Sequence, residues 1–411
     1  MKHLDTILPE MPSDWTPHPL PGKPRGYSKD AFVLPEHAKR LLAVLNPHDK
    51  DSRIWFDEEP HKYYVDGIET SGSCTGLVHT FFEEFQADLV IANMMKGKKW
   101  PRSTYMSDDV TDYLHCYSVI IALLSSVTRL KSCEEKRNAL NGLINTQDLS
   151  SLINSFKCII ENGISEEHKG TVAMSLQTIR LDIKRNAKHF PNYHIIEETF
   201  QRITRTLAMT TDQIKVKWDA DGAYAANQGT WMHLQAELFL NRDPCHTDTI
   251  EMQTFFTYLE RQMIPLKVKA FRTEWEIYSE EENIAGSIDF VGIKPNGHLV
   301  LVDWKRTKEL EYKMKSVYNT KMKEPMEYLD DCSGTHYKLQ LNIYKYMIEK
   351  NYNYVVDEMQ VACFHPDRNG CPFVVDVPIM KNEVAYMMAY QRKKHADSIL
   401  ERYKTKLMRN K

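Results

Sequence analysis

A short Asp-Trp-Lys triplet, Asp303 to Lys305, stands at the end of an apolar run that is typical of a β-strand. Because strand side chains alternate between the two faces, Asp303 and Lys305 point to one side and Trp304 to the other. A Pro-Asn-Gly hairpin signal precedes the run, which predicts that Asp289, the last residue of a Gly-Ser-Ile-Asp motif, lies on the neighbouring strand. Two carboxylates and an amine at the end of an apolar sheet are costly unless a partner satisfies them. We therefore expect a divalent metal and a scissile phosphate to meet there.

Two further pairs of polar residues are spaced one helical turn apart, so the members of each pair share a helix face. His233 and Glu237 follow Gly229 in a segment that reads as helix, and Gln340 and Tyr344 lie in another amphipathic segment. An Asp-x-Lys triplet alone carries little information, because a chain of this length contains roughly one by chance. The functional prediction therefore depends on the order and spacing of all four motifs.

Taken in order, Gly-x-x-x-His, Gly-x-x-Asp, Asp-x-Lys behind an apolar strand and Gln-x-x-x-Tyr on a helix resemble the RecB-like exonuclease branch of the PD-(D/E)xK nuclease superfamily. Mitochondrial genome maintenance exonucleases and CRISPR-associated RecB-like nucleases are similar examples. The resemblance covers residues 212 to 395, and an earlier block, residues 63 to 75, looks like the entry strands and Ser-x-Thr turn of that family. It implies an α/β fold with a restriction-endonuclease-like core, in which helices flank a mixed central sheet and the metal site lies at one edge.

The resemblance also implies roles for the individual site residues. His233, Asp289 and Asp303 would ligate Mg²⁺ or Mn²⁺, together with the backbone carbonyl of Trp304, and Lys305 would orient or deprotonate the attacking water. The chemistry is reasonable on physical grounds, because a bound divalent ion lowers the pKa of its water from about 15.7 toward 7 and stabilises charge on the phosphate. Carboxylate and imidazole ligands with open water positions suit Mg²⁺ or Mn²⁺.

Two glutamates are candidates for supporting this site. Glu274, on a predicted strand before Asp289, fits the strand glutamate of the family and is expected to orient metal ligands or waters. Its alternative is a place on a solvated strand face. Glu237 is expected to support the ligands as well, and its alternative is the exposed side of its helix.

The second helical pair is expected to contact the substrate. By resemblance, Gln340 and Tyr344 touch the nucleic-acid strand near the cleaved phosphate, and His336, one turn earlier, is a further candidate for reaching the site. The alternative for the amide and the phenol is hydrogen bonding within the fold.

The composition is that of an ordinary globular protein. The chain has 411 residues, 42% of them hydrophobic and 27% charged, which argues against a disordered chain and gives enough length for a sizeable core. Its apolar runs stay well below the about 18 residues of a membrane span, so we expect no membrane contact. The first ten residues lack both an apolar secretory segment and an Arg-rich transit pattern. We therefore expect an intracellular protein of the nucleus, the cytoplasm or a viral replication site, and not a secreted one.

The net charge of -3 says little about nucleic-acid binding, because the distribution of charge matters more than its sum. Lys96, Lys98 and Lys99 lie beside Trp100, and the tail from Arg392 to Lys411 holds eight Lys or Arg residues. The first cluster is predicted to grip phosphates, with Trp100 as a platform on which a base of a single strand stacks. The alternative for both clusters is a solvated surface.

Eight cysteines are scattered along the chain without a Cys-x-x-Cys pair, which is typical of reduced intracellular thiols. Some members of the resembling family carry an iron-sulfur cluster that uses one upstream cysteine and three behind the Gln-x-x-x-Tyr helix. Only Cys363 and Cys371 follow that helix here. We therefore expect neither an iron-sulfur cluster nor a structural zinc.

The motifs divide the chain into five segments. We predict a Pro-rich arm over residues 1–52, the first strands and helix of the nuclease domain over 53–104, a helical insertion over 105–211, the nuclease core over 212–395 and a basic tail over 396–411. By resemblance, the insertion forms an arch over the active site through which a single strand threads. The alternative is a docking module for a helicase or recombinase.

Together these expectations describe a metal-dependent DNA exonuclease that prefers single-stranded ends or flaps and serves replication, recombination or repair. RNA stays an alternative substrate, because the hydrolysis is indifferent to the 2′-hydroxyl unless a contact excludes it. A structure-specific endonuclease of the same fold is the near alternative. A nuclease-fold DNA-binding module without activity is the alternative from another class, and the intact set of predicted ligands with Lys305 argues against it.

Overall fold

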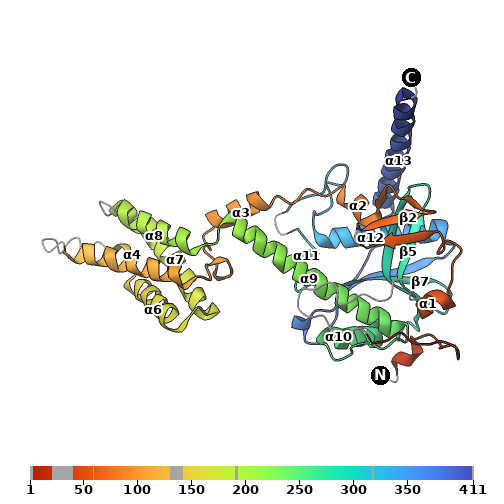
Figure 1. The fold of residues 1–411 in the computed structure, drawn as a ribbon, viewed down its shortest axis with the longest axis horizontal. Helices are drawn as coiled ribbons and strands as arrows, with labels where there is room; N and C mark the ends of the chain where they lie inside the picture. Colours follow the sequence, from red (N-terminus) through yellow and green to blue (C-terminus); the bar gives the residue numbers. More distant parts are fainter. Residues whose placement is uncertain are drawn as a thin grey trace. The chain divides into compact units, whose positions relative to one another are not determined.

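The computed structural model describes residues 3–20, 40–58, 60–129, 142–189, 193–316 and 319–409 (Figure 1). The chain forms two compact units, which we call the sheet unit (Met1–Glu84 with Ala223–Lys411) and the helical unit (Phe85–Gly222). Part of the predicted Pro-rich arm, residues 21–39, and the last two residues of the predicted basic tail lie outside the described residues.

A six-stranded mixed sheet organises the sheet unit. Its strands are β4 (Gly72–Ser73), β5 (Lys269–Ser279), β6 (Ile284–Ile293), β7 (Leu299–Lys305), β8 (Val356–Cys363) and β9 (Phe373–Asp376). The order is β4-β6-β7-β8-β9, and β5 also pairs with β6. The β5-β6, β6-β7 and β8-β9 pairs are antiparallel, whereas β4-β6 and β7-β8 are parallel. The predicted α/β fold with a mixed central sheet is therefore confirmed.

The predicted hairpin between the two acidic motifs is present. Lys294 N donates to His298 O at 2.9 Å, and Gly297 adopts a φ of +82° that favours glycine, so the chain reverses directly between β6 and β7. Antiparallel pairing then sets Phe290 opposite Val302. Asp289 consequently lies on the strand next to the Asp-Trp-Lys triplet.

The sheet splits beside Asp289. One edge of β6 pairs with β4 through residues 284 and 285 and with β7 through residues 290 to 293, so the described pairing on this edge skips residues 286 to 289. Strand β7 continues past Val302, the end of its pairing with β6. The backbone N–H of Trp304 donates instead to Asp289 Oδ2 at 2.6 Å. A carboxylate thus occupies the position where a strand partner would otherwise be.

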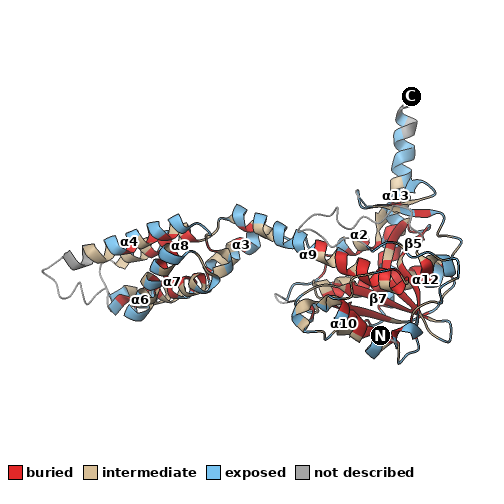
Figure 2. Ribbon diagram, turned by 60° about the horizontal axis from the view of Figure 1, so that its bottom comes forward, coloured by how far each residue is buried: buried red, intermediate tan, exposed pale blue. Residues whose placement is uncertain are grey.

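Two hydrophobic cores cover the two faces of this sheet, and Figure 2 shows that the buried residues of the sheet unit lie in and around it. Leu299 and Leu301 belong to one core, with residues of α2, α12 and α13, whereas Val300, Val302 and Trp304 belong to the other, with residues of α9 and α10. This alternation confirms that Trp304 points away from the face of Asp303 and Lys305. The helices that provide these cores are α2 (Cys74–His79), α9 (Thr211–Leu240), α10 (Ile250–Tyr258), α12 (Ser333–Asn351) and α13 (Lys381–Arg409).

The remaining elements of the sheet unit lie mostly in the N-terminal segment. They are a 3-10 turn (Leu4–Thr6), α1 (Leu41–Leu45) and an antiparallel sheet of β1 (Ile54–Asp57), β2 (Lys62–Val65) and β3 (Ile68–Glu69). Later in the chain come a π-helical segment (Leu259–Met263), α11 (Leu310–Lys313) and a second 3-10 turn (Pro366–Arg368). Leu4 and Ile7 are buried in the core under α9 and α10, and Ala270 N donates to Ile7 O at 2.8 Å. The start of the predicted arm therefore packs against the body of its unit.

The helical unit has its own core. It contains α3 (Ala87–Lys96), α4 (Val110–Arg129), α6 (Thr146–Asn162), α7 (Glu166–Asn186), α8 (Tyr193–Leu207) and the first part of α9. Residues of α4, α6, α7 and α8 share one hydrophobic cluster. The unit begins at Phe85 and ends at Gly222, so it is longer at both ends than the insertion predicted for residues 105 to 211. Within the described ranges, the helices are too short or too polar to cross a membrane.

Candidate metal and active site

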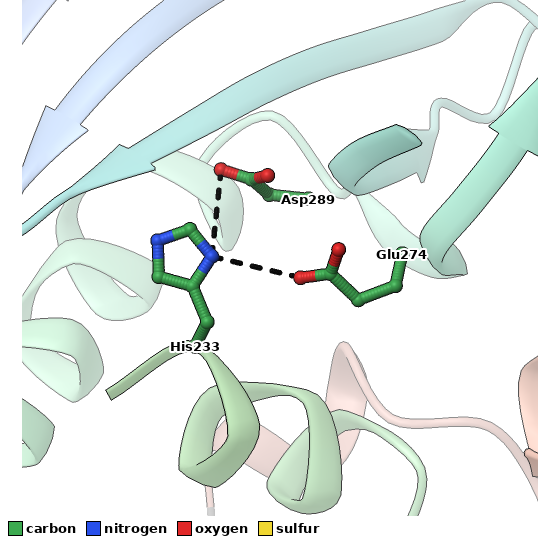
Figure 3. Close-up of side chains that lie close together, drawn as sticks. All are labelled: His233, Glu274 and Asp289. Atoms are coloured by element: carbon green, nitrogen blue, oxygen red, sulfur yellow. Dashed lines mark ion pairs between the residues drawn. The ribbon is translucent and has the colours of Figure 1, made fainter. Parts of the chain in front are cut away.

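Three side chains from three elements converge where the sheet splits. They are His233 of α9, Glu274 of β5 and Asp289 of β6, shown in Figure 3. His233 Nδ1 lies 3.6 Å from Glu274 Oε1 and 3.8 Å from Asp289 Oδ2. One potential ligand atom of each residue lies within 4.8 Å of the others. One imidazole and two carboxylates at this spacing are a donor set that fits Mg²⁺ or Mn²⁺.

The orientation of the imidazole follows from its second nitrogen. His233 Nε2 lies 3.1 Å from the backbone carbonyl oxygen of Trp304. When Nε2 carries the proton it donates to this carbonyl, which leaves Nδ1 free to act as a ligand on the side of the two carboxylates. The carbonyl that we predicted as a metal ligand therefore orients the imidazole through Nε2, the nitrogen that does not face the two carboxylates, and its ligation of a metal remains a prediction.

The charge balance of the cluster calls for a cation. Burial disfavours the charged imidazole, but the carboxylates of Asp289 and Glu274 outweigh this effect and raise the pKa of His233 to about 9. Burial also raises the pKa of Asp289, and His233 opposes that rise. Without a metal, the protonated imidazole of His233 thus balances part of the negative charge of Asp289 and Glu274. A divalent cation bound at the same place would take over this role.

We therefore expect metal binding to release a proton. Because the pKa of His233 is raised, its imidazole is protonated at pH 7.5, and a metal must displace this proton; the apparent affinity for Mn²⁺ should rise with pH and level off above about 9. Calorimetric titration with Mn²⁺ at pH 7.5, in two buffers of different ionisation enthalpy, should report release of about one proton per ion. The His233→Gln variant is the control, and a binding heat independent of the buffer in the unsubstituted protein would contradict this prediction.

Asp303 and Lys305 form a second group beside the cluster. Lys305 Nζ lies 2.7 Å from Asp303 Oδ2, and it also lies 4.8 Å from the centre of the Tyr337 ring. Burial raises the pKa of Asp303 to about 6, although Lys305 opposes the rise. Burial lowers the pKa of Lys305, but Asp303 and Asp289 outweigh burial and hold that pKa above its ordinary value. Of the two predicted roles of Lys305, this favours a protonated group that orients water or phosphate over one that deprotonates water.

Sequence reasoning did not identify Tyr337. It is three residues before Gln340 on the same helix, so the i, i+3 spacing was the available signal. Its ring covers the Lys305 ammonium and limits the directions in which that amine can donate.

The cluster differs from the predicted ligand set in one position. Glu274, expected to orient the ligands, lies among them, whereas Asp303 lies with Lys305 outside the group of mutually close ligand atoms. Glu274 has a φ of +43°, which is uncommon for a residue with a side chain, and Ser287 Oγ donates to its Oε2 at 3.2 Å. Backbone strain of this kind is often found at functional sites. Ligation by Asp303 remains a prediction.

Glu237 is buried, and its carboxylate is held by the N-terminal segment. Arg40 Nε donates to Glu237 Oε1 at 2.7 Å, and a second guanidinium nitrogen donates to Oε2 at 3.2 Å. The alternative of an exposed helix face is therefore wrong. Four residues later, Asn241 Nδ2 donates to Oγ1 of Thr273, the residue before Glu274, at 2.8 Å. Asn241 Oδ1 accepts from Leu42 N at 2.9 Å. These bonds fix α9 against β5, and thus His233 against Glu274.

Removing Arg40 should leave a buried carboxylate without its partner. We expect Arg40→Met to lower the free energy of unfolding by about 3 kcal/mol, the usual cost of breaking a buried ion pair from one side. Urea denaturation followed by near-ultraviolet circular dichroism measures this loss. The double variant Arg40→Met/Glu237→Met is the control and should lose less stability than the two single variants summed. Strict additivity of the two single losses would show that the pair is not coupled.

Tyr344 lies inside the fold, which corrects the prediction that it touches the nucleic acid. It is 3% exposed, and Gln340 Nε2 donates to its hydroxyl at 2.8 Å. A Cβ at Gly286 would lie 2.7 Å from its ring and 3.1 Å from Cys74 Sγ, which explains the glycine of the Gly-x-x-Asp motif. The phenol of Tyr344 is buried because it packs directly against the backbone of β6 at Gly286. Contact of the half-buried Gln340 with a strand remains a prediction.

His336 packs in an aromatic group, with its ring centre 4.4 Å from that of His79. Burial, then the nearby His79 and Lys305, lower the pKa of His336 to about 4, so it is neutral near pH 7. Among the described residues, the interaction of His336 with the site is the electrostatic effect of Lys305 on its pKa. Its predicted approach to the substrate remains a prediction.

The predicted phosphate-binding cluster belongs to the helical unit. Lys96, Lys98 and Lys99 are exposed, as expected. Trp100, however, is 6% exposed and packs with Ile91 and Ile214. Its ring is therefore not available to stack on a base, and that part of the prediction is wrong. The reason is tertiary, because Ile214 comes from the distant helix α9.

Comparison with known families agrees with this geometry. The profile of one family, described as the PD-(D/E)XK nuclease superfamily, matches residues 196–410. The matched range contains all three residues of the cluster and the pair of Asp303 and Lys305. Among curated protein sequences, none matches the chain significantly.

Proposed function

We propose that this chain, which belongs to the PD-(D/E)XK nuclease superfamily, is a divalent-metal-dependent DNA exonuclease that acts on single-stranded ends or flaps in replication, recombination or repair. One observation carries the proposal: the close approach of His233, Glu274 and Asp289, next to the ion pair of Asp303 and Lys305. Preference for ends rests on the resemblance of the four ordered motifs to the RecB-like exonuclease branch.

In this proposal some residues of the site bind the metal and one contacts the water or the substrate. His233, Glu274 and Asp289 are placed to hold Mg²⁺ or Mn²⁺, with Asp303 and the Trp304 carbonyl as further candidates. When bound, the ion supplies a water of lowered pKa and a positive charge near the phosphate. Lys305, kept protonated by Asp303 and Asp289, donates to the water or to a phosphate oxygen.

The charges support a site that needs both a metal and a lysine. Glu274, Asp289 and Asp303 bring three negative charges when ionised, and Lys305 brings one positive charge. With His233 neutral, a divalent ion balances the remaining two charges before the phosphate adds its own. Without the ion, an anionic substrate would meet excess negative charge and be repelled.

The test is digestion of one DNA sequence, labelled at the 5′ or the 3′ end, as a linear single strand, a duplex and a closed single-stranded circle. Each is incubated with Mg²⁺, Mn²⁺ or EDTA. We expect metal-dependent stepwise shortening of the linear strand from an end and no cleavage of the circle. Cleavage of the circle would make the protein an endonuclease, and binding without digestion under any condition would make it a DNA-binding module.

A further inference from the structure

A loop of the helical unit carries a concentrated positive charge that the active site does not use. We call residues 96–102 the cationic loop, whose exposed charged side chains are Lys96, Lys98, Lys99 and Arg102. The chain from residue 89 to residue 107 contains no Asp or Glu. The nearest acid before it, Asp88, is paired with Lys215 at 2.6 Å. Among the residues that the structure describes, these four cations have no ion-pair partner.

Two buried side chains of the loop pack into the helical unit and hold the loop in place. Trp100 and Pro101 are buried, and the Trp100 ring lies 6.2 Å from that of Tyr105 in a stacked arrangement. Tyr105 in turn accepts a hydrogen bond from Trp218 Nε1 at 2.9 Å. The only aromatic residue of the loop is therefore buried in the unit, whereas its four cationic side chains are exposed.

Helix α7 fixes the loop backbone. Gln177 Nε2 donates to Lys99 O at 3.1 Å and to Pro101 O at 2.6 Å. One turn later, an Arg180 guanidinium nitrogen lies 3.5 Å from Gly97 O and 3.4 Å from Trp100 O. A backbone held at several carbonyls loses little conformational freedom on binding, so its charges are preorganised for a ligand.

We propose that the cationic loop binds the phosphodiester backbone of nucleic acid and makes no contact with the bases. Four clustered cations without internal counter-ions match a regularly spaced polyanion, and binding releases the counter-ions of that polyanion. Burial of Trp100 removes the stacking platform that base recognition on a single strand uses. The identity of the polyanion rests on the proposed function, whereas the surface itself lies outside the catalytic residues.

The experiment compares two variants of the whole 411-residue chain in the Lys305→Met background, which is expected to slow cleavage, and EDTA is present to prevent what cleavage remains. The loop variant carries Gln at Lys96, Lys98, Lys99 and Arg102; the control variant carries Gln at four other exposed cations of the same unit, Lys157, Arg185, Arg202 and Arg205. Both remove four positive charges. Fluorescence anisotropy then measures Kd for an oligothymidine strand and for an abasic strand of equal length, over a series of salt concentrations.

We expect the loop variant to bind both strands about tenfold more weakly or worse. The magnitude of the slope of log K against log salt should fall by about 3, because each of the four lost phosphate contacts contributes about 0.7 to the slope on a single strand. The factor should be the same for the thymidine and the abasic strand. The control variant should change Kd much less. Equal losses in the two variants, or a loss confined to the thymidine strand, would overturn the proposal.

A second measurement avoids substitution of the loop. In the Lys305→Met protein, the abasic strand should protect Lys96, Lys98 and Lys99 from acylation, detected by mass spectrometry, while Lys157 stays reactive. Unchanged acylation of the loop lysines at saturating abasic strand would also overturn the proposal. Either negative result leaves the proposed nuclease activity intact, because that activity is tested by cleavage and not by these contacts.

Discussion

Lys305→Met should lower the rate of DNA cleavage by about 10²- to 10³-fold, the usual effect of removing one preorganised donor from a site where negative charge develops. The ammonium lies 2.7 Å from Asp303, and the carboxylates of Asp303 and Asp289 hold its pKa above the ordinary value, so it is a charged donor at neutral pH. Methionine has similar length and fills the same space without the charge. The measurement is the single-turnover rate with saturating Mg²⁺ and a labelled single strand.

Lys308→Met is the matched control, because Lys308 is an exposed lysine three residues later that pairs with Asp367. We expect its rate to equal that of the unsubstituted protein. Mn²⁺ binding, measured by calorimetry, should survive in both variants because neither lysine belongs to the cluster of His233, Glu274 and Asp289. A Lys305→Met rate close to the unsubstituted rate would remove this residue from the mechanism.

Asp289→Asn should abolish metal binding and strongly lower the rate of cleavage. Its carboxylate faces His233 Nδ1 at 3.8 Å and accepts the N–H of Trp304 at 2.6 Å. Asparagine keeps a carbonyl oxygen for that N–H, so the split in the sheet should persist, but it removes the negative charge that a cation requires. Loss of about 4 kcal/mol of transition-state stabilisation corresponds to a rate about 10³-fold lower.

The measurements for this variant are Mn²⁺ calorimetry and the same single-turnover assay. Asp357→Asn is the control, because Asp357, a residue of β8, pairs with His298 and takes no part in the cluster. Circular dichroism should show the same fold for both variants. Normal Mn²⁺ binding by Asp289→Asn would mean that the metal is held elsewhere, for example on the side of Asp303.

Local sequence determined the part of the site that depends on strand geometry and one tight turn. The two-residue period placed Asp303 and Lys305 on one face, and the hairpin signal placed Asp289 on the next strand; the structure has both. These features follow from backbone sterics over a few residues, which act whatever the rest of the chain does. The family profile confirms the superfamily that the ordered motifs predicted, although it does not distinguish the RecB-like branch.

Tertiary structure decided which polar groups reach the metal cluster and which are buried elsewhere. Glu274 enters the cluster with a positive φ that no local pattern indicates, and Glu237 is paired with Arg40, which is 197 residues away. Trp100 and Tyr344, both predicted to touch nucleic acid, are buried by residues distant in the chain. Burial and ion pairing are sums over such distant neighbours, so residue type and spacing along the chain do not determine them. Spacing along the chain placed the strands of the candidate site, and packing between remote segments selected the side chains that converge there.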